Sequence, residues 1–241
     1  MKLFEDTVAI WTIRLSQIKS DMPKYTLALS TEETKRAKSF VSKCDRESFV
    51  LSRGALRSIL SRYLSIPAND IELSYNRHGK PQVSDGTSPI VEFNLSHSGD
   101  YALYALTKRT PIGIDIERVR SRNPEHYIRL AHRFFSKSET DTIKNCPHNE
   151  IVPLFFWFWT RKEAYVKQHG HGLALPLNNF TVDIDRQNRA RLVNTPWCPN
   201  DIDSTRIYDL KVANGYCAAY SVGSTNAMTI QQYTEGRLLA A

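Results

Sequence analysis

The most informative stretch of the chain reads Trp159-Thr-Arg-Lys-Glu-Ala-Tyr-Val-Lys-Gln-His-Gly-His-Gly-Leu173. It follows an aromatic run and ends in glycines, a pattern that predicts the last turns of a long buried helix. Glu163 and Lys167 are four residues apart, which places their charged groups on one face of that helix. Two interpretations are open at this point: an ordinary ion pair, or a metal ligand beside a cation that contacts phosphate.

A second acidic pair lies upstream, in Gly113-Ile-Asp-Ile-Glu117. Alternation along a strand places Asp115 and Glu117 on one face and the isoleucines on the other. Two neighbouring carboxylates repel each other, and in a partly buried site they stay ionised only when a cation lies between them. Oxygen ligands of this kind suit Mg²⁺, with Glu163 as a third ligand. An acidic strand end that faces solvent is the other interpretation.

Composition and charge argue against several classes of protein. Hydrophobic residues make up 41% of the 241 residues, and no apolar run is long enough to span a bilayer. We therefore expect a cytoplasmic protein without a membrane segment or signal peptide. The four cysteines are scattered, which favours neither a zinc site nor a disulfide framework. The formal charge of +7 suggests an anionic partner, but the basic residues are spread out and no nucleic-acid-binding motif is present, so we expect no nucleic-acid ligand.

The first half of the chain, residues 1–108, reads as helices and short strands. Ser30 and Glu33 form a capping box that begins a helix at 30–40. In the longer helix that follows, Arg53 and Arg57 are four residues apart and could hold a phosphate together. The other predicted elements of this half are that helix at about 45–64 and strands at 5–15, 71–75, 80–83, 91–95 and 101–107.

The polar segment Lys108-Arg-Thr-Pro111 is the predicted boundary between two halves. Residues 109–224 form the second half, and residues 225–241 are expected to be a flexible tail. Each half reads as a short antiparallel sheet packed on a long helix, which is an α+β fold. The predicted elements of the second half are a strand at 112–117, helices at 124–132, 136–144 and 150–168, and strands at 179–185, 190–194, 207–212 and 216–222.

Two motifs of the first half carry polar chemistry. Asn94-Leu-Ser-His-Ser-Gly99 is predicted as a strand end followed by a tight turn, in which Ser96 and His97 either bind an anion or form an ordinary hydrogen-bonded turn. Gly79-Lys-Pro81 places a lysine on a rigid turn, where it suits contact with a phosphate or a nucleobase. The chain contains no GxSxG, Walker A or GxGxxG motif. The combined inventory suits chemistry at a diphosphate.

These blocks, in this order, resemble the Sfp-type 4′-phosphopantetheinyl transferases, which activate carrier proteins of peptide, polyketide and fatty acid synthesis. Each block alone is weak, whereas five blocks in register are specific to the family. The matching residues are Gly79-Lys-Pro81, Phe93-Asn-Leu-Ser-His-Ser98, Pro111-Ile-Gly-Ile-Asp-Ile-Glu117, Arg133-Phe-Phe-Ser136 with Glu139, and Trp159-x-x-Lys-Glu-Ala-x-x-Lys167 with the Gly-x-Gly-Leu173 that follows.

The resemblance implies that coenzyme A binds in a cleft between two pseudo-symmetric halves of one chain. The 4′-phosphopantetheine arm would pass to a serine hydroxyl of an apo acyl or peptidyl carrier protein, and 3′,5′-ADP would leave. Glu163, Lys167 and His97 would be catalytic, with Lys167 binding phosphates and protonating the departing 3′,5′-ADP. The other implied contacts are Asp115, Glu117 and Glu163 on Mg²⁺ (or Mn²⁺), Ser96 and His97 on the phosphates, Gly79, Lys80 and Pro81 on the adenine and phosphate side, and Arg53 and Arg57, with Arg36, at the 3′-phosphate.

The base that removes the serine proton is either Glu163 or a metal-bound water, because a coordinated carboxylate is a weak base. The partner surface would be an acidic helix of the carrier, which suits the charge of +7, and residues 127–135 are the predicted docking segment. By the same resemblance we expect a monomer. Two further functions remain open from the residues alone: a Mg²⁺-dependent nucleotide phosphodiester hydrolase, and a non-enzymatic nucleotide-binding module.

Overall fold

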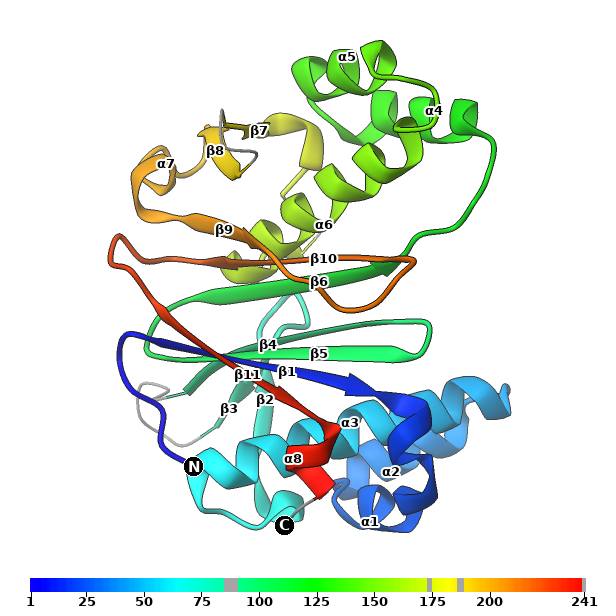
Figure 1. Cartoon of the computed structure of the whole chain (residues 1–241). Helices are drawn as coiled ribbons and strands as arrows, with labels where there is room; N and C mark the ends of the chain where they lie inside the picture. The colour runs from blue at the N-terminus through cyan, green and yellow to red at the C-terminus, as the bar shows by residue number, and fades with distance from the viewer. Residues whose placement is uncertain (85–90, 173–174, 186–188, 240–241) are drawn as a thin grey trace.

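Two β-sheets lie in the middle of the molecule, and helices cover their outer sides (Figure 1). The structure is a computed structural model that describes the chain except residues 85–90, 173–174, 186–188 and 240–241, so Leu173 lies outside the described residues. The first sheet has the order β11 (Thr229–Thr234), β1 (Thr7–Arg14), β5 (Tyr101–Lys108) and β4 (Val91–Ser98). The second has the order β6 (Ile112–Arg118), β10 (Tyr216–Val222) and β9 (Arg206–Asp209).

One long helix covers each sheet, which confirms the predicted α+β fold (Figure 1). The first sheet packs on α3 (Lys43–Leu64), accompanied by α1 (Met22–Leu27), α2 (Thr31–Ser39) and α8 (Glu235–Leu239). The second sheet packs on α6 (Ile151–His169), beside α4 (Pro124–Phe134) and α5 (Lys137–Asn145). The remaining elements are two hairpins, β2 (Leu73–Tyr75) with β3 (Pro81–Val83) and β7 (Thr181–Ile184) with β8 (Ala190–Asn194), the short α7 (Asp201–Ser204), and the 3-10 turns Leu15–Asp21, Ala68–Asp70 and Leu177–Asn179.

The two sheets share an apolar core. Ile10 and Leu103 from the first sheet pack in one cluster with Ile114 and Ile116 from the second, and each of these side chains is at most 1% exposed. Because side chains alternate along a strand, the isoleucines of β6 face this core and Asp115 faces the other way. The alternation predicted for Gly113-Ile-Asp-Ile-Glu117 is therefore what aims its acids away from the core.

Gly113 allows α6 to lie directly against β6. A Cβ atom at this position would lie 2.0 Å from the carbonyl oxygen of Ala164 and 2.3 Å from the backbone nitrogen of Gln168. Any side chain here would force the helix away from the strand. The glycine therefore brings the helix that carries Glu163 and Lys167 close to the strand that carries Asp115.

The C-terminal segment differs from the expected flexible tail. Strand β11 pairs in parallel with β1, with Thr7 opposite Thr229 and Thr12 opposite Thr234, and α8 follows it. The segment returns to the first sheet, where backbone pairing along the edge of β1 orders it. Residues 240–241 lie outside the described part of the chain.

The turn predicted around His97 is shorter in the structure. Strand β4 continues through Ser98, and its pairing with β5 places His97 opposite Ala102 and Ser98 opposite Tyr101. Gly99, whose φ is 57°, makes the reversal together with Asp100. Ser96 and His97 are thus held on a paired strand, which fixes their directions more firmly than a loop would.

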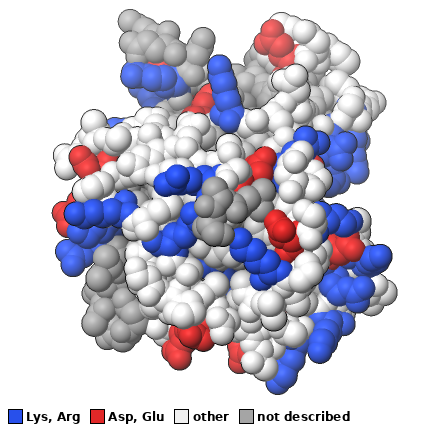
Figure 2. Space-filling model, turned by 60° about the horizontal axis from the view of Figure 1, so that its bottom comes forward, with Lys and Arg blue, Asp and Glu red and all other residues white. Residues whose placement is uncertain are grey.

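The surface in Figure 2 carries charges of both signs. Lys and Arg side chains are spread over this face, with Asp and Glu side chains between them. This mixed distribution does not form the single-sign stripe that nucleic-acid-binding surfaces show. No helix in the described part of the chain has the length and apolar character needed to cross a membrane.

Candidate active site

A cleft of about 550 Å³ lies between the two halves of the chain. All the predicted site residues line it except Arg57 and the less specific candidate Arg36. Both halves therefore supply its walls, as the family resemblance implied. The lining consists of Arg53 from α3, residues 78–81 after β2, Asn94, Leu95, Ser96 and His97 from β4, Asp115 and Glu117 from β6, and Trp159, Glu163, Lys167, Gly170 and Gly172 from α6 and the loop after it.

The floor of the cleft is a seam between β4 and β6. Asn94 Oδ1 accepts a hydrogen bond from the backbone N–H of Ile114 at 2.9 Å, and Ser98 Oγ accepts one from that of Arg118 at 3.0 Å. Between them, Ser96 Oγ bonds the Asp115 carboxylate at 2.9 Å. Short polar side chains thus join the two sheets in a fixed register. This role of Asn94 and Ser98 was not predicted, although polar residues at every second position of a strand could have signalled it.

Asp115 and Lys167 form the central charge pair of the cleft. Lys167 Nζ donates to Asp115 Oδ1 at 2.6 Å and to Ser96 Oγ at 3.0 Å. The other carboxylate oxygen, Asp115 Oδ2, is buried and has no hydrogen-bond partner among the described residues. A buried acceptor without a partner is costly, and a bound cation would satisfy it.

Two more carboxylates raise the negative charge of the same cleft. Ser98 Oγ donates to Glu117 at 3.0 Å, while burial and the neighbouring Asp115 raise the pKa of Glu117. Burial, with Asp115 as the next cause, raises the pKa of Glu163 to about 7. Lys167 opposes both shifts without cancelling them. The repulsion among these acids is therefore only partly relieved by the protein's own cation.

The donor set of the cleft fits a magnesium ion. In the part of the chain that the structure describes, no three His, Cys, Asp or Glu side chains are already grouped as metal ligands. Nevertheless Asp115, Glu117 and Glu163 all face this cleft, and the unpartnered Asp115 Oδ2 is a hard oxygen donor of the kind that Mg²⁺ prefers. A small shift of these side chains toward an ion would relieve both their repulsion and the unsatisfied acceptor.

The opposite side of the cleft is cationic. Arg53 Nη1 is buried without a hydrogen-bond partner among the described residues, and Arg53 Nε lies 3.5 Å from Glu33 Oε1. Burial, followed by the charges of Lys167 and Arg53, lowers the pKa of His97. A bound phosphate would satisfy the arginine and offset the repulsion that the imidazolium meets.

Arg57 is not part of this cleft. Its side chain is 2% exposed, its Nε pairs with Glu33, and its Nη1 donates to the carbonyl oxygens of Ala68 and Ile71 at 2.8 and 2.9 Å. Arg53 and Arg57 lie four residues apart on α3, as predicted, but the buried Glu33 binds Arg57. Arg57 therefore anchors α2 and the turn after α3, and the structure does not bring it to the predicted phosphate site.

Lys80 reaches the cleft but is largely engaged by backbone. Its Nζ donates to the carbonyl oxygens of Ile112 at 3.1 Å and Gln168 at 3.0 Å. Burial lowers its pKa. The lysine expected on a phosphate thus links the β2–β3 hairpin to the second half of the chain.

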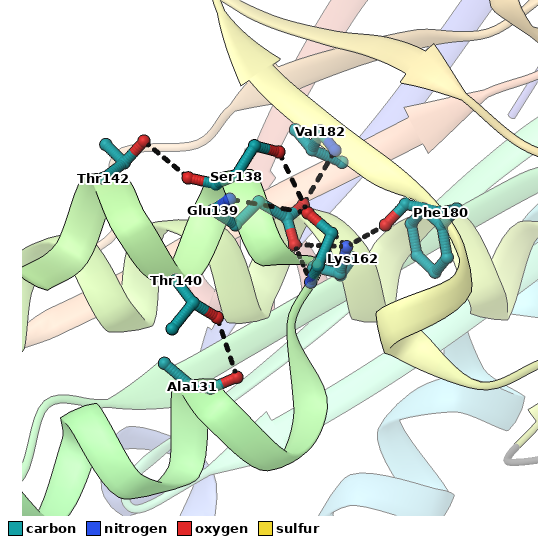
Figure 3. Close-up of polar contacts among 9 residues, drawn as sticks. Ala131, Ser138, Glu139, Thr140, Thr142, Lys162, Phe180 and Val182 are labelled. Carbon is teal, nitrogen blue, oxygen red and sulfur yellow. Dashed lines mark hydrogen bonds and ion pairs between the residues drawn. The ribbon is translucent and has the colours of Figure 1, made fainter.

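Glu139, the acid that follows the Arg133-Phe-Phe-Ser136 block, is held by polar contacts to neighbouring elements (Figure 3). Ser136 and Glu139 form a capping box at the start of α5. The Glu139 carboxylate also binds Lys162 Nζ at 2.6 and 2.8 Å and the backbone N–H of Val182 at 2.8 Å. Lys162 and Glu139 are 0% and 1% exposed, so this ion pair does not face the cleft. It holds α5, α6 and β7 together, although both residues belong to the blocks that match the family.

Known proteins match the chain over most of its length. The family model of the 4′-phosphopantetheinyl transferase superfamily matches residues 111–221, and that of the 4′-phosphopantetheinyl transferase N-terminal region matches residues 16–109. The 4′-phosphopantetheinyl transferase HetI of Nostoc sp. is 34% identical over 81% of this chain and 82% of its own. The 4′-phosphopantetheinyl transferase Sfp of Bacillus subtilis is 31% identical over 86% of this chain and 88% of its own.

Among solved structures, the holo-(acyl-carrier-protein) synthase from Bacillus anthracis in complex with CoA (3′,5′-ADP) is 18% identical, with a TM-score of 0.39, over 48% of this chain and 96% of its own. The sequence matches confirm the family predicted from the five blocks, and they favour a transferase over the hydrolase and the binding module. The chain belongs to the Sfp-type 4′-phosphopantetheinyl transferases, which pass the 4′-phosphopantetheine arm of coenzyme A to carrier proteins.

Proposed function

We propose that the cleft binds coenzyme A together with Mg²⁺ and transfers its 4′-phosphopantetheine arm to the serine hydroxyl of an apo acyl or peptidyl carrier protein, with release of 3′,5′-ADP. One observation carries this proposal. Asp115 is buried between Lys167 and Ser96, its second oxygen has no partner among the described residues, and two further carboxylates line the same cleft. Such a site is complete only with a cation and an anionic substrate.

Asp115, Glu117 and Glu163 would hold the ion, which can be Mg²⁺ or Mn²⁺. When bound, it neutralises charge on the pyrophosphate of coenzyme A. Lys167, in contact with Asp115, lies where it can bind the same phosphates. The three carboxylates alone would repel this anionic substrate, so the balance of charge requires both cations.

The coenzyme would lie along the cationic wall. Ser96 and His97 on β4 contact its phosphates, and Arg53, whose Nη1 lacks a partner among the described residues, contacts the 3′-phosphate. The turn at Gly79, Lys80 and Pro81 lines the adenine side. Gly79 adopts a φ of 86° with no atom near the position of a Cβ, so a side chain is absent where the base would approach.

Proton transfer at the reacting atoms would involve two residues of α6, Glu163 and Lys167. The serine oxygen forms a bond to the phosphorus that bears pantetheine, and the bond from that phosphorus to the bridging oxygen breaks. Glu163 or a metal-bound water would take the serine proton, because coordination to the ion lowers the pKa of about 7 that Glu163 has in the metal-free protein. Lys167 donates a proton to the departing 3′,5′-ADP. Burial lowers the pKa of His97 in the ligand-free cleft, and phosphates bound beside the imidazole would raise it again.

The carrier would dock beside Trp159, where a second groove begins. This groove shares Glu117 and Trp159 with the cleft and has a volume of about 300 Å³. Within the predicted segment 127–135, Phe135 is 3% exposed, belongs to the core and does not line the groove, so the proposed docking surface is the groove and not the whole segment. Its other lining residues are Arg118, Arg120, Arg122, His126, Tyr127, Leu130, Phe134, Phe155 and Phe156.

The arginines of this groove suit an acidic helix of a carrier protein. We expect Arg120→Glu to raise the KM for the carrier about tenfold or more and to leave the KM for coenzyme A unchanged. Arg129→Glu is the matched control, because Arg129 is exposed on α4 and does not line the groove. Equal effects of the two substitutions would contradict this docking surface.

A single chain supplies both walls of the cleft, and on this ground we infer that the protein acts as a monomer. The transferase assignment is tested by incubating the protein with coenzyme A, Mg²⁺ and a panel of apo carrier proteins, followed by intact-mass measurement. The expected result is a gain of one phosphopantetheine arm on at least one carrier, which EDTA prevents. Release of 3′,5′-ADP from coenzyme A without any carrier would instead support a hydrolase.

A further inference from the structure

The turn between β2 and β3 reaches across the cleft to the end of α6. Asn76 Nδ2 donates to the carbonyl oxygen of Gly170 at 2.7 Å, over a separation of 94 residues in the chain. Lys80 Nζ donates to that of Gln168 at 3.0 Å. The rings of His78 and His171 meet edge to face, with their centroids 5.7 Å apart. One short turn of the first half is thus attached to the helix end of the second.

These contacts satisfy a specific need of α6. The last carbonyl groups of a helix have no partner within the helix, and the helix dipole makes this end negative. The ammonium of Lys80 supplies a donor to Gln168 in the last turn, and the amide of Asn76 bonds the carbonyl oxygen of Gly170, the residue that caps the helix. Gly170 has a φ of 66°, and a Cβ there would lie 2.8 Å from Asn76 Nδ2, so the glycine also makes room for this contact.

Asn76 shapes the turn as well as the helix end. Its Oδ1 accepts hydrogen bonds from the backbone N–H groups of His78 and Lys80, both at 2.9 Å. The backbone of Asn76 also donates to the carbonyl oxygen of Lys80 at 3.0 Å, which closes the turn. The same side chain therefore fixes the turn that carries Gly79 and Lys80 on one wall and the loop at Gly170 on the other.

We propose that Asn76 is a positioning residue for coenzyme A, because its amide joins the β2–β3 turn to the carbonyl of Gly170 and so sets the distance between the two walls of the cleft. Asn76 itself does not line the cleft, whereas Gly79, Lys80 and Gly170 do. The proposal rests on the proposed function of the cleft. Without this link, Lys80 and the ring contact of His78 still join the turn to the end of α6, but coenzyme A must order the rest of the two walls when it binds. Glu163 and Lys167 remain held by the packing of α6 on β6.

The test is Asn76→Asp, which keeps an acceptor for the two N–H groups of the turn but replaces the donor to Gly170 with a negative charge facing a carbonyl. We expect the Kd and the KM for coenzyme A to rise about tenfold, the usual effect of losing one hydrogen bond, and kcat at saturating coenzyme A to stay within about twofold. Retained kcat shows that the variant is folded. Asn76→Ser, which is too short to reach Gly170, should behave in the same way.

Asn69→Asp is the matched control, because it makes the same charge change on the preceding turn, where the Asn69 amide bonds the exposed Asp70. It should leave both constants unchanged. Kd and KM of the Asn76 variants within about twofold of the wild type would overturn the proposal. Unfolding of both variants would also overturn it, since the contact would then be a requirement of the fold. Binding of coenzyme A is measured by calorimetry without a carrier, so a failed transfer assay refutes the proposed function separately.

Discussion

Helix α6 carries two lysines five residues apart, Lys162 and Lys167, and each pairs with a carboxylate from another element. The surroundings of the two pairs are opposite. Lys162 and Glu139 are 0% and 1% exposed, and the ammonium has three acceptors: both oxygens of Glu139 and the carbonyl oxygen of Phe180 at 2.6 Å. In the second pair the side chain of Lys167 is 28% exposed, and its partner Asp115 keeps one buried oxygen without a partner among the described residues. The first pair is saturated, because the Lys162 ammonium and both Glu139 oxygens have partners within the protein. The second pair is unsaturated, because one Asp115 oxygen has no partner among the described residues.

We infer from this difference that the first pair is structural and the second functional, although both lysines belong to the same sequence signature. A charge whose partners are all within the protein contributes to the fold and has no capacity for a ligand. A buried acceptor that lacks a partner costs free energy unless something else binds it. We therefore propose that Lys162 and Glu139 serve stability and that Lys167 and Asp115 bind substrate and metal.

The largest effect is expected from breaking the saturated pair. Lys162→Met keeps the volume of the side chain but leaves the carboxylate of Glu139 buried without its cation. The free energy of unfolding should fall by about 3–5 kcal/mol, which chemical denaturation measures. Lys144→Met is a control, because it removes the same charge from an exposed site on α5. A loss no greater than that of the control would show that Lys162 is not structural.

Replacement of Lys167, the lysine of the unsaturated pair, should lower the turnover rate. In Lys167→Met, one cation at the transferring phosphate is lost, and kcat should fall by about 100-fold. The rate of carrier modification at saturating coenzyme A measures this. Turnover close to that of the wild type would contradict the role of Lys167 and would leave the two lysines indistinguishable.

A smaller effect is expected on the pH dependence of the free energy of unfolding, through Glu163 in the same cleft as the unsaturated pair. Because the pKa of Glu163 is raised from 4.5 to about 7, the metal-free folded protein holds a proton that the unfolded chain has already lost. The free energy of unfolding should therefore fall as the pH rises from 4.5 to about 7, by about 1–2 kcal/mol once solvent screening is allowed for. Denaturation in EDTA across this range should show the slope, and Glu163→Gln should abolish it. An unchanged slope in Glu163→Gln would assign it to other groups.

The smallest effect is expected at the seam beneath the unsaturated pair. Ser98→Ala removes the acceptor for the N–H of Arg118 and the donor to Glu117, and should cost about 1 kcal/mol of stability. Ser58→Ala is the control, since the Ser58 hydroxyl bonds back to the carbonyl oxygen of Gly54 within its own helix. Thermal melts compare the two, and a Ser98 variant as stable as the control would show that the seam contributes nothing.

Local patterns predicted most of the fold. The capping box of Ser30 and Glu33, the alternation of Asp115 and Glu117, and the glycine that ends α6 act through neighbours within a few residues, and the structure has all three. The pairing of β11 with β1 has no such signature, because backbone groups more than 200 residues apart make it. The expectation of a flexible tail was therefore wrong for residues 229–234.

Most residues that line the cleft could be predicted, but the group that each cationic side chain binds could not. Arg53 and Arg57 share a helix face, but the buried Glu33 and two backbone carbonyl groups engage Arg57 away from the cleft. Lys80 likewise has the right neighbours in sequence, whereas the carbonyl groups it binds come from the other half of the chain. Which acceptor a cationic side chain binds depends on the groups that the tertiary fold brings near it. Spacing along one helix or strand does not reveal these groups.

One paired measurement tests the contrast between the two sites most directly. Carrier modification per folded molecule and the free energy of unfolding are determined for Asp115→Asn and Glu139→Gln in parallel. The account predicts that Asp115→Asn loses turnover by about 100-fold or more and keeps its stability within about 1 kcal/mol, because the substitution also relieves repulsion from Glu117 and Glu163. It predicts that Glu139→Gln loses stability and keeps its turnover. Full activity in Asp115→Asn, or loss of turnover without loss of stability in Glu139→Gln, would contradict it.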